Sequence, residues 1–388
     1  MVTTHAYDSL TEEQLSGVVG IKWTAYPDCI GAFIAEMDFG TAPCVVDALH
    51  ATVDAGFYGY LPKALSDDLA AACARWYKEE CGWDVSPENI KALPDVLKGL
   101  EITLNHYSRP DAKVIVLTPA YMPFLSVPGF LRKEIIQVAM HQTDGRWELD
   151  YAGIDAAFAA GGGTLILCNP HNPIGRVLTR DELLKVSTVV AKHNGRVFSD
   201  EIHAPLTFGE HRHVPYASVS DEAAGHTITA IAASKAWNLA GLKCAQLVFS
   251  NAADTKVWEE IGFFAGHGAS TLGVIASIAA YSDGREWLDG VRDYLDGNRK
   301  RLGELVAELL PGVSYVMPEG TYLAWLDFSK TGLDGDLAVF FRERAKVAVN
   351  DGAACGEVGR GNLRFNFAMP RPLMERAVRQ MADAFTSM

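Results

Sequence analysis

Positive charge is scarce in this chain of 388 residues, which has 34 Lys and Arg against 48 Asp and Glu and a formal net charge of −14. Binding to nucleic acid or to an anionic membrane surface depends on an excess of Lys and Arg. We therefore expect neither as a partner. A single bound phosphate group is compatible with this charge, because the N-terminus of one helix can hold it.

Apolar runs long enough for a bilayer are also missing. The stretch at residues 267–282 has no Asp, Glu, Lys or Arg, but it is too short and too rich in Gly, Ser and Ala to cross a membrane. It predicts a buried helix. The first residues, MVTTHAYDSLTEEQ, have neither the basic region nor the apolar region of a secretory signal, so we expect none.

Cysteine pairs with metal-binding spacing are lacking. The seven cysteines are odd in number and scattered, without a C-x-x-C pair. This pattern is typical of a reducing cytosol and not of a disulfide framework or a zinc site. We expect a cytoplasmic protein without a metal, in which the cysteines are small buried side chains. They are Cys29, Cys44, Cys73, Cys81, Cys168, Cys244 and Cys355.

Short apolar runs alternate with helical patterns through the middle of the chain. The alternation predicts an α/β domain with a mostly parallel sheet covered by helices on both faces. One helical pattern follows Thr179, which with Glu182 has the spacing of a capping box. The predicted strands are residues 113–121, 163–173, 195–203, 226–235 and 244–250.

The pattern changes after about residue 285. A long helix comes first, then two segments of strand character and a final helix. This order predicts a smaller α+β domain beside the large α/β domain. We assign residues 46–285 to the large domain, and residues 1–45 together with 286–388 to the small domain.

Polar residues follow the predicted strands, at the edge where an open α/β sheet binds its ligands. Lys235 ends one apolar run. A lysine at a strand end is normally hydrated, but a buried lysine beside cations has a lowered pKa and can attack an aldehyde. Asp200 ends another run. A buried carboxylate there can hold the proton on a cofactor's pyridine nitrogen, or it can cap a helix.

The most specific motif is NPHNPIG at residues 169–175. Each of its prolines removes an N–H donor and constrains the turn, so the amide of Asn172 can face a ligand oxygen. Arg364 lies within a late apolar run, where an unpaired charge is costly. The α-carboxylate of an amino acid suits its planar guanidinium, and an internal Asp or Glu is the alternative partner.

These motifs, in the order NPxNPxG, D-x-x-H, S-K and R, resemble the class I/II aminotransferase superfamily of pyridoxal 5′-phosphate (PLP) enzymes, of aspartate-aminotransferase fold type I. The resemblance covers nearly the whole chain and implies that the large domain binds PLP. It implies that Lys235 carries PLP as a Schiff base, that Asp200 pairs with the pyridine nitrogen and that Asn172 binds the phenolic oxygen. Arg364 would bind the substrate carboxylate.

The same resemblance implies roles for two aromatic residues. His203 falls where many members have a tyrosine that faces the phenolic oxygen, and a structural histidine is the alternative. Tyr121, in TPAYMPF, resembles the aromatic residue that stacks on the cofactor ring, with a core tyrosine as the alternative.

The predicted phosphate site departs from the usual pattern of the superfamily. Lys243 stands where an arginine is common, and Ala232 where a hydroxyl residue is usual. The resemblance leaves Ser234, Lys243 and the backbone N–H groups of Val96 and Leu97, at the start of a helix, to hold the phosphate.

Several further stretches resemble the cystathionine β-lyase-like carbon–sulfur lyases, the MalY/PatB group. In that group YGY supplies a tyrosine that reaches the cofactor phosphate of the neighbouring subunit, here Tyr60. This implies a homodimer with a shared active site. Tyr322 would lie near the substrate, unless it is a core residue. The stretches are KW from residue 22, AEMDF from 35, YGY from 58, PEGTYLAWLDF from 318 and NDGAACG from 350.

The resemblance implies that Lys235 removes the Cα proton of a small amino-acid substrate. A β-lyase then expels a thiolate from Cβ, so that cystathionine or another S-substituted L-cysteine yields thiol, pyruvate and ammonia. A class I/II aminotransferase is the alternative, and only the group resemblance favours elimination. A non-catalytic binding or regulatory protein is a remote alternative, because Lys235, Asp200 and Arg364 are all present.

Overall fold

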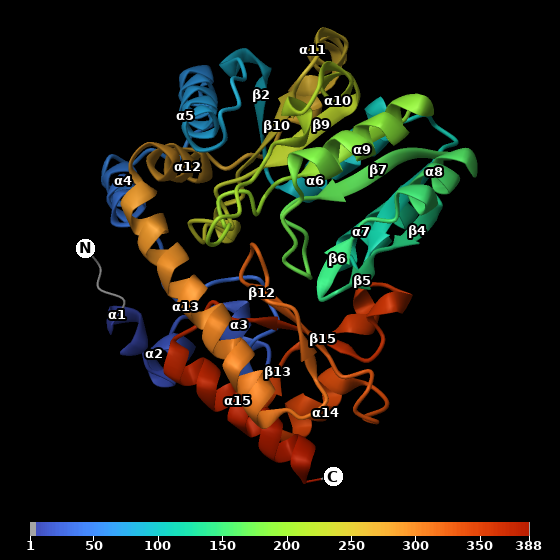
Figure 1. Ribbon diagram of the computed structural model, residues 1–388. Coiled ribbons are helices and arrows are strands. Elements are labelled where there is room, and N and C mark those ends of the chain that lie inside the picture. Colours follow the sequence, from blue (N-terminus) through green and yellow to red (C-terminus); the bar gives the residue numbers. More distant parts are fainter. Residues whose placement is uncertain (1–4, 388) are drawn as a thin grey trace.

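The computed structural model describes residues 5–387 and contains a large sheet and a smaller sheet connected by one long helix, α13 (Arg285–Leu309) (Figure 1). The strands are β1 (Ile30–Gly31), β2 (Ile90–Leu93), β3 (Lys113–Thr118), β4 (Ile135–Ala139), β5 (His141–Thr143), β6 (Arg146–Glu148), β7 (Gly162–Cys168), β8 (Arg196–Asp200), β9 (Thr227–Ile231), β10 (Ala245–Phe249), β11 (Ser314–Tyr315), β12 (Leu323–Asp327), β13 (Val347–Ala348), β14 (Asn350–Asp351) and β15 (Asn362–Asn366). The other helices are α1 (His5–Asp8), α2 (Glu12–Gly17), α3 (Ile21–Thr24), α4 (Pro43–Asp54), α5 (Lys63–Cys81), α6 (Val96–Ile102), α7 (Met122–Phe130), α8 (Tyr151–Ala159), α9 (Arg180–Lys192), α10 (Asp221–His226), α11 (Ala252–Ala265), α12 (Thr271–Asp283), α14 (Leu337–Arg344) and α15 (Arg371–Thr386).

Within the described range, seven strands form the large sheet in the order β2-β10-β9-β8-β7-β3-β4. Neighbouring strands from β9 to β4 are parallel, while β10 runs antiparallel to both of its neighbours. This confirms the predicted α/β architecture and all five predicted strands. The sequence patterns did not predict β2 and β4, which form the two edges of the sheet.

Helices cover both faces of the large sheet, and successive residues of its strands point to opposite faces. Along β3, Ile115 and Leu117 pack in a cluster with side chains of α8 and α9. Val114 and Val116 pack in another cluster, with side chains of α6 and α7. Burial on both faces explains why the strands read as continuous apolar runs.

Two predicted helices are present. Thr179 caps α9, where its hydroxyl accepts from the Glu182 N–H and the Glu182 carboxylate accepts from the Thr179 N–H, which confirms the capping box. The uncharged stretch forms α12, which packs between α4 and α5 and buries Val274, Ala276 and Ala280. No helix among residues 5–387 is long and apolar enough to span a bilayer.

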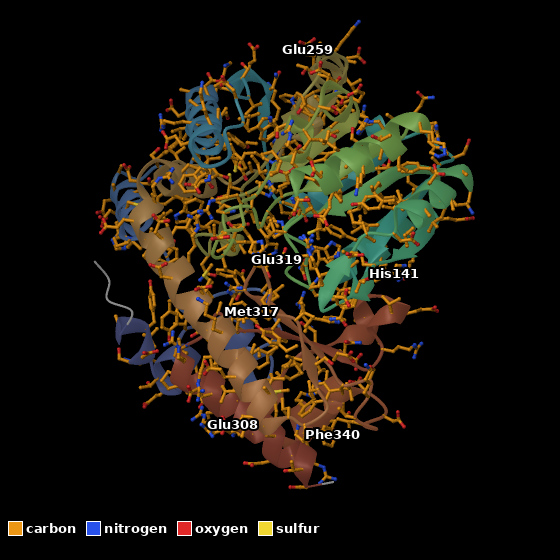
Figure 2. All side chains as sticks on the ribbon, in the orientation of Figure 1. His141, Glu259, Glu308, Met317, Glu319 and Phe340 are labelled. Atoms are coloured by element: carbon orange, nitrogen blue, oxygen red, sulfur yellow. The ribbon has the colours of Figure 1, made fainter. Side chains whose placement is uncertain are left out.

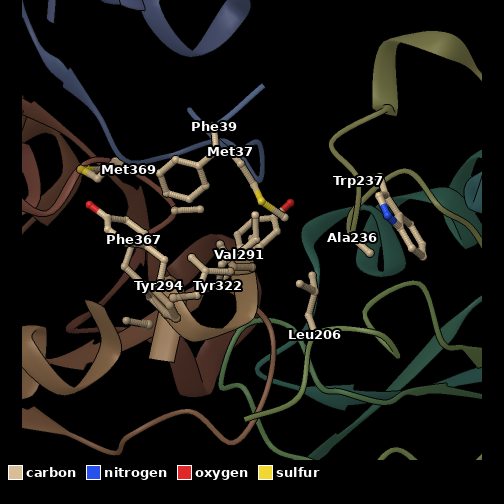
Figure 3. Packing of buried hydrophobic residues seen from close by; sticks show 14 of the residues in the cluster. Met37, Phe39, Leu206, Ala236, Trp237, Val291, Tyr294, Tyr322, Phe367 and Met369 are labelled. Carbon is tan, nitrogen blue, oxygen red and sulfur yellow. The ribbon is translucent and has the colours of Figure 1, made fainter. Parts of the chain in front are cut away.

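The smaller sheet has the order β11-β12-β15-β14, with antiparallel neighbours, and α15 packs along α13 (Figure 1). The N-terminal segment joins this part of the molecule, because β1 pairs in parallel with β13. Met37 and Phe39 lie in one buried cluster with Tyr322, Phe367 and Met369 (Figure 3). These contacts support the assignment of the first residues to a small domain, whose boundaries stay a prediction.

A tight junction joins the loop after β7 to the segment before β12. Gly175 has a φ of +69°, and a Cβ at this position would lie 2.2 Å from Cβ of Pro318. Its carbonyl accepts hydrogen bonds from the N–H groups of Glu319 and Gly320. Arg176 forms an ion pair of 2.6 Å with Glu319, which lies between the upper and lower parts of the molecule in Figure 2. The glycine of NPxNPxG therefore allows the two parts to approach.

Candidate active site

A cavity of about 540 Å³ lies at the carboxyl edge of the large sheet. The loops after β3, β7, β8 and β9 reach it because parallel strands end at the same edge. The antiparallel β10 begins at this edge and β2 ends there, which explains why residues before β10 and after β2 also line it. Ten predicted site residues line the cavity: Val96, Leu97, Tyr121, Asn172, Asp200, His203, Ser234, Lys235, Lys243 and Arg364.

Lys235 lines the cavity instead of extending into solvent, as a hydrated lysine would. Its Nζ donates a hydrogen bond of 2.8 Å to the Ala35 carbonyl oxygen. Burial, and after it the positive charge of Arg364, lower the pKa of Lys235 to about 8, although the charges of Glu36 and Asp200 act in the opposite direction. Far more of this amine is therefore neutral near neutral pH than in a solvated lysine, as a nucleophile or a general base requires.

Asp200 ends β8 with its carboxylate buried. Burial raises the pKa of Asp200 to about 7. Its Oδ1 accepts from the Ile202 N–H at 3.1 Å, and a turn follows where the alternative interpretation required a helix. The carboxylate therefore does not cap a helix. A cationic ring N–H in the cavity would stabilise its ionised form.

His203 is a buried, uncharged ring beside the same cavity. Burial lowers the pKa of His203 to about 3, with smaller contributions from the charges of Lys235 and Arg364. Its Nδ1 is buried and has no hydrogen-bond partner among the described residues. A buried ring nitrogen without a partner fits a ligand oxygen that would occupy the cavity.

Tyr322 lies behind the cavity wall. It is fully buried, its ring meets His203 edge-on at 6.0 Å between centroids, and its hydroxyl donates to the Ala35 carbonyl at 2.9 Å. Tyr322 therefore reaches the cavity through Ala35 and is not one of its lining residues. Trp325, within β12, packs in the cluster that contains side chains of α8 and α9.

Arg364 is a buried guanidinium without a carboxylate partner among the described residues. Its Nη2 donates to the Phe33 carbonyl at 2.8 Å and to Oδ1 of Asn350 at 2.7 Å, and Nη1 donates to Oδ1 of Asn172 at 3.3 Å. Its Nε has no hydrogen-bond partner within residues 5–387. The alternative of an internal Asp or Glu is therefore not realised, and the cation is available to a ligand carboxylate.

The predicted phosphate end of the cavity is formed by the start of α6. Val96 and Leu97 are its first two residues, and N–H groups at this position have no intrahelical acceptor. Lys243 has a φ of +51°, and its Nζ lies 3.0 Å from Oδ2 of Asp95, the N-cap residue. The positive charge at this end is thus matched by a carboxylate, which the sequence did not indicate.

Tyr60 is absent from the cavity. Its side chain is 93% exposed, and it borders a separate surface depression of about 930 Å³. Tyr58 and Phe263, also exposed, line the same depression. One subunit alone therefore does not bring Tyr60 to Lys235.

The lining residues that were not predicted include Glu36, Asn350 and Cys168. Glu36 and Asn350 belong to AEMDF and NDGAACG, which we used only as resemblances. Their polar side chains beside apolar residues were the available signal, but no local spacing connects them to Lys235.

The residues of this cavity fit PLP. A partly deprotonated lysine can bond to its aldehyde, the buried Asp200 can face its ring nitrogen, and the buried Nδ1 of His203 is available to an oxygen. Tyr121, which lines the cavity from the start of α7, can contact the ring face.

Comparison with known proteins agrees with this site. The chain belongs to the aminotransferase class I and II family, whose model matches residues 28–381. It is 39% identical to a cystathionine β-lyase of Corynebacterium glutamicum, over 96% of this chain and 98% of that protein. It is 31% identical to the cystathionine β-lyase PatB of Bacillus subtilis, over 97% and 98% of the two chains.

A solved structure is similar throughout. A protein of Corynebacterium diphtheriae, described as a candidate PLP-dependent β-cystathionase, superposes with a TM-score of 0.93 at 39% identity. The similarity covers 97% of this chain and 98% of that one. Both the large and the small parts of the fold are therefore shared.

Proposed function

We propose that this chain is a PLP-dependent carbon–sulfur β-lyase that cleaves L-cystathionine to homocysteine, pyruvate and ammonia with the uptake of one water molecule. The observation that carries the proposal is Lys235, whose lowered pKa of about 8 and place beside Asp200 and Arg364 suit a cofactor lysine and general base. The cystathionine β-lyases among its relatives support elimination.

The proposed cofactor contacts follow from the cavity. Lys235 would bond to PLP, Asp200 would face the ring nitrogen, and Asn172 and His203 would face the phenolic oxygen. Tyr121 would lie against the ring. PLP, when bound, withdraws electrons from the substrate Cα and so makes its proton removable.

The phosphate of PLP would lie at the start of α6. The N–H groups of Val96 and Leu97 are its proposed donors, together with the hydroxyl of Ser234. Lys243 adds positive charge there, in competition with its ion pair to Asp95.

The chain's own groups then perform binding and proton transfer. The guanidinium of Arg364 binds the α-carboxylate of the substrate and orients Cα toward Lys235. The neutral Nζ of Lys235 takes the Cα proton, after which the Cβ–S bond breaks with its electron pair on sulfur. The Tyr322 hydroxyl and Nζ of Lys235 both donate to the Ala35 carbonyl oxygen. Tyr322 therefore helps to position the lysine through this shared acceptor.

The alternative is a class I/II aminotransferase. The same lysine favours it. In a transamination Lys235 would return the Cα proton to the cofactor, whereas in an elimination Lys235 keeps the proton while the thiolate leaves. A non-catalytic regulatory protein remains remote, since it would not need a partly deprotonated lysine within the cavity.

We further propose a homodimer in which Tyr60 of one subunit reaches the phosphate site of the other. The exposed aromatic rings around it, including Tyr58 and Phe263, are the surface expected at such an interface. We also infer a cytoplasmic enzyme of sulfur amino acid metabolism, in methionine biosynthesis, because homocysteine is the proposed product.

The test is to mix the purified protein with L-cystathionine and follow pyruvate, free thiol and the visible spectrum. Pyruvate and thiol formed over many turnovers, by a yellow protein that absorbs near ~420 nm, would support the lyase. The Lys235→Ala variant should then be inactive and should lack this band. Conversion of the cofactor to its amine form, with no pyruvate until a keto acid is added, would instead indicate an aminotransferase. A protein that stays colourless with added PLP would contradict both.

A further inference from the structure

Glu36 lines the active-site cavity and has no role in the mechanism above. Among the described residues, no hydrogen bond or ion pair involves its carboxylate. The side chain is only partly exposed. It is close enough to the reacting lysine for its negative charge to oppose the lowering of the pKa of Lys235 that burial and Arg364 cause.

The other two carboxylates of the cavity have partners or an assigned position. Asp95 pairs with Lys243 and also caps α6 by accepting from the Lys98 N–H. Asp200 accepts from the Ile202 N–H and lies where the cofactor's ring nitrogen is proposed. Among the described residues, Glu36 is therefore the carboxylate of the cavity with neither a hydrogen bond or ion pair to its side chain nor an assigned position, and Lys235 is the cation on which its charge acts.

The backbone around Glu36 is held firmly. Its carbonyl oxygen accepts hydrogen bonds from Nζ of Lys22 at 3.1 Å and from Nδ2 of Asn366 at 2.7 Å. The next residue, Met37, is buried, and its N–H and carbonyl both bond to the side chain of Asn238. Figure 3 shows Met37 within the buried cluster that adjoins the site. The segment thus keeps Glu36 at the cavity wall.

A carboxylate that loses contact with water is unfavourable unless a cation or hydrogen-bond donors approach it, and a substrate that fills the cavity would cover Glu36 further. In the proposed reaction Arg364 binds the substrate α-carboxylate, and the substrate amino group would be held beside Lys235, at the cofactor end of the cavity. Neither of these two substrate groups is available to form an ion pair with Glu36. A cation that these groups do not supply is present at the far end of the substrate side chain, beyond sulfur, where L-cystathionine has a second ammonium group.

We propose that Glu36 is a specificity-determining residue that selects S-substituted cysteines whose leaving group has an ammonium group. The inference rests on the proposed lyase function and narrows its substrate class. It separates substrates that have a distal cation from alkyl conjugates of the same length, which offer Glu36 no charge.

Two matched substrates test the selection. S-(2-aminoethyl)-L-cysteine and S-propyl-L-cysteine have side chains of equal length that end in an ammonium and a methyl group. We expect the wild-type protein to prefer the ammonium compound in kcat/KM, mainly through KM. Glu36→Gln should reduce the ratio of the two kcat/KM values about tenfold, the effect of losing one charged hydrogen bond. Glu36→Asp should keep part of the ratio.

A binding measurement makes the test independent of turnover. L-Lysine and L-2-aminoheptanoate are carbon analogues of the two substrates and have no sulfur to expel. Their dissociation constants for the PLP-loaded protein, read from the cofactor spectrum, should differ in the same direction, and the difference should shrink in Glu36→Gln. Glu308→Gln, an exposed carboxylate on α13 far from the cavity (Figure 2), is the matched control and should keep both ratios.

The outcomes separate the two proposals. Equal ratios in wild type and Glu36→Gln, for both turnover and binding, would overturn the role of Glu36 and leave the lyase intact. Failure to form pyruvate from any of the sulfur compounds would overturn the lyase function. The dissociation constants of L-lysine and L-2-aminoheptanoate would still decide whether Glu36 binds a distal cation. Should Glu36→Gln fold poorly, wild type that binds the two analogues equally would refute the proposal.

Discussion

Nη1 of Arg364 lies 3.3 Å from Oδ1 of Asn172, although 192 positions separate the two residues in the chain. Arg364 belongs to β15 of the small sheet, and Asn172 to the loop after β7 of the large sheet. This contact joins the proposed carboxylate site to the proposed cofactor site. A substrate held by Arg364 would therefore lie next to the ring that Asn172 contacts.

Arg364→Gln should lower kcat/KM for L-cystathionine by about 30-fold to 150-fold, because one or two charged hydrogen bonds to the α-carboxylate are worth about 2–3 kcal/mol. Most of the loss should be in KM. Steady-state kinetics measure it, with the cofactor absorption band as the control for an intact site. An unchanged KM would show that another group binds the carboxylate.

Cofactor capture by the PLP-free protein should depend on pH with a midpoint near 8. Only the neutral amine attacks the aldehyde, and the pKa of Lys235 is lowered to about 8, first by burial and then by Arg364. The rate should therefore rise as pH increases through 8 and level off above it. Stopped-flow absorption measures the rate. Arg364→Gln should move the midpoint to higher pH, and a midpoint near 10.5 in the wild type would contradict the lowered pKa.

Loss of either partner of the Lys22–Asp38 ion pair should destabilise the protein by about 3–5 kcal/mol. Nζ of Lys22 lies 2.9 Å from Oδ2 of Asp38, both side chains are only 3% exposed, and Trp23 donates to the same carboxylate. Lys22→Met leaves Asp38 buried without its cation. Urea unfolding of Lys22→Met and Asp38→Asn measures the change.

The double variant Lys22→Met with Asp38→Leu is the control for this ion pair. It removes both charges and should recover part of the lost stability, since no unpaired charge remains. Single variants that unfold within about 1 kcal/mol of the wild type would show that water reaches the pair.

Mixed dimers should show that Tyr60 acts across the interface. Tyr60→Phe and Lys235→Ala each impair every site of their own homodimers. In a mixed dimer one site has both substitutions and the other has neither, if Tyr60 serves the neighbouring subunit. Subunit exchange between equal amounts should then restore about a quarter of the wild-type sites. No gain over the Tyr60→Phe protein alone would place Tyr60 outside the shared site.

Local sequence predicted most of the large sheet and ten of the residues that line the cavity. The five apolar runs became strands because burial on both faces demands β-branched and apolar residues at every position. Lys235, Asp200 and Asn172 could be predicted to meet because parallel strands end at one edge. The edge strands β2 and β4 were missed, since they have one side that needs no partner and weaker patterns.

Contacts between distant segments could not be predicted. The pairing of Lys243 with Asp95 bridges 148 positions and changes the charge available at the phosphate end. Glu36 and Ala35 reach the cavity because the first residues pack beside the last strands, as the β1–β13 pair shows. No pattern within AEMDF indicates that this segment packs beside the C-terminal strands.

The sequence by itself determined the α/β class, the strand-end positions of the reactive residues and the absence of an excess of positive charge. These depend on side-chain type and local periodicity, which are readable one segment at a time. Tertiary structure alone decided the pKa of Lys235, the unpaired Nε of Arg364, the place of Tyr322 behind the wall and the exposure of Tyr60. Burial and charge proximity are properties of the packed chain, because they arise only when segments far apart in sequence exclude water together.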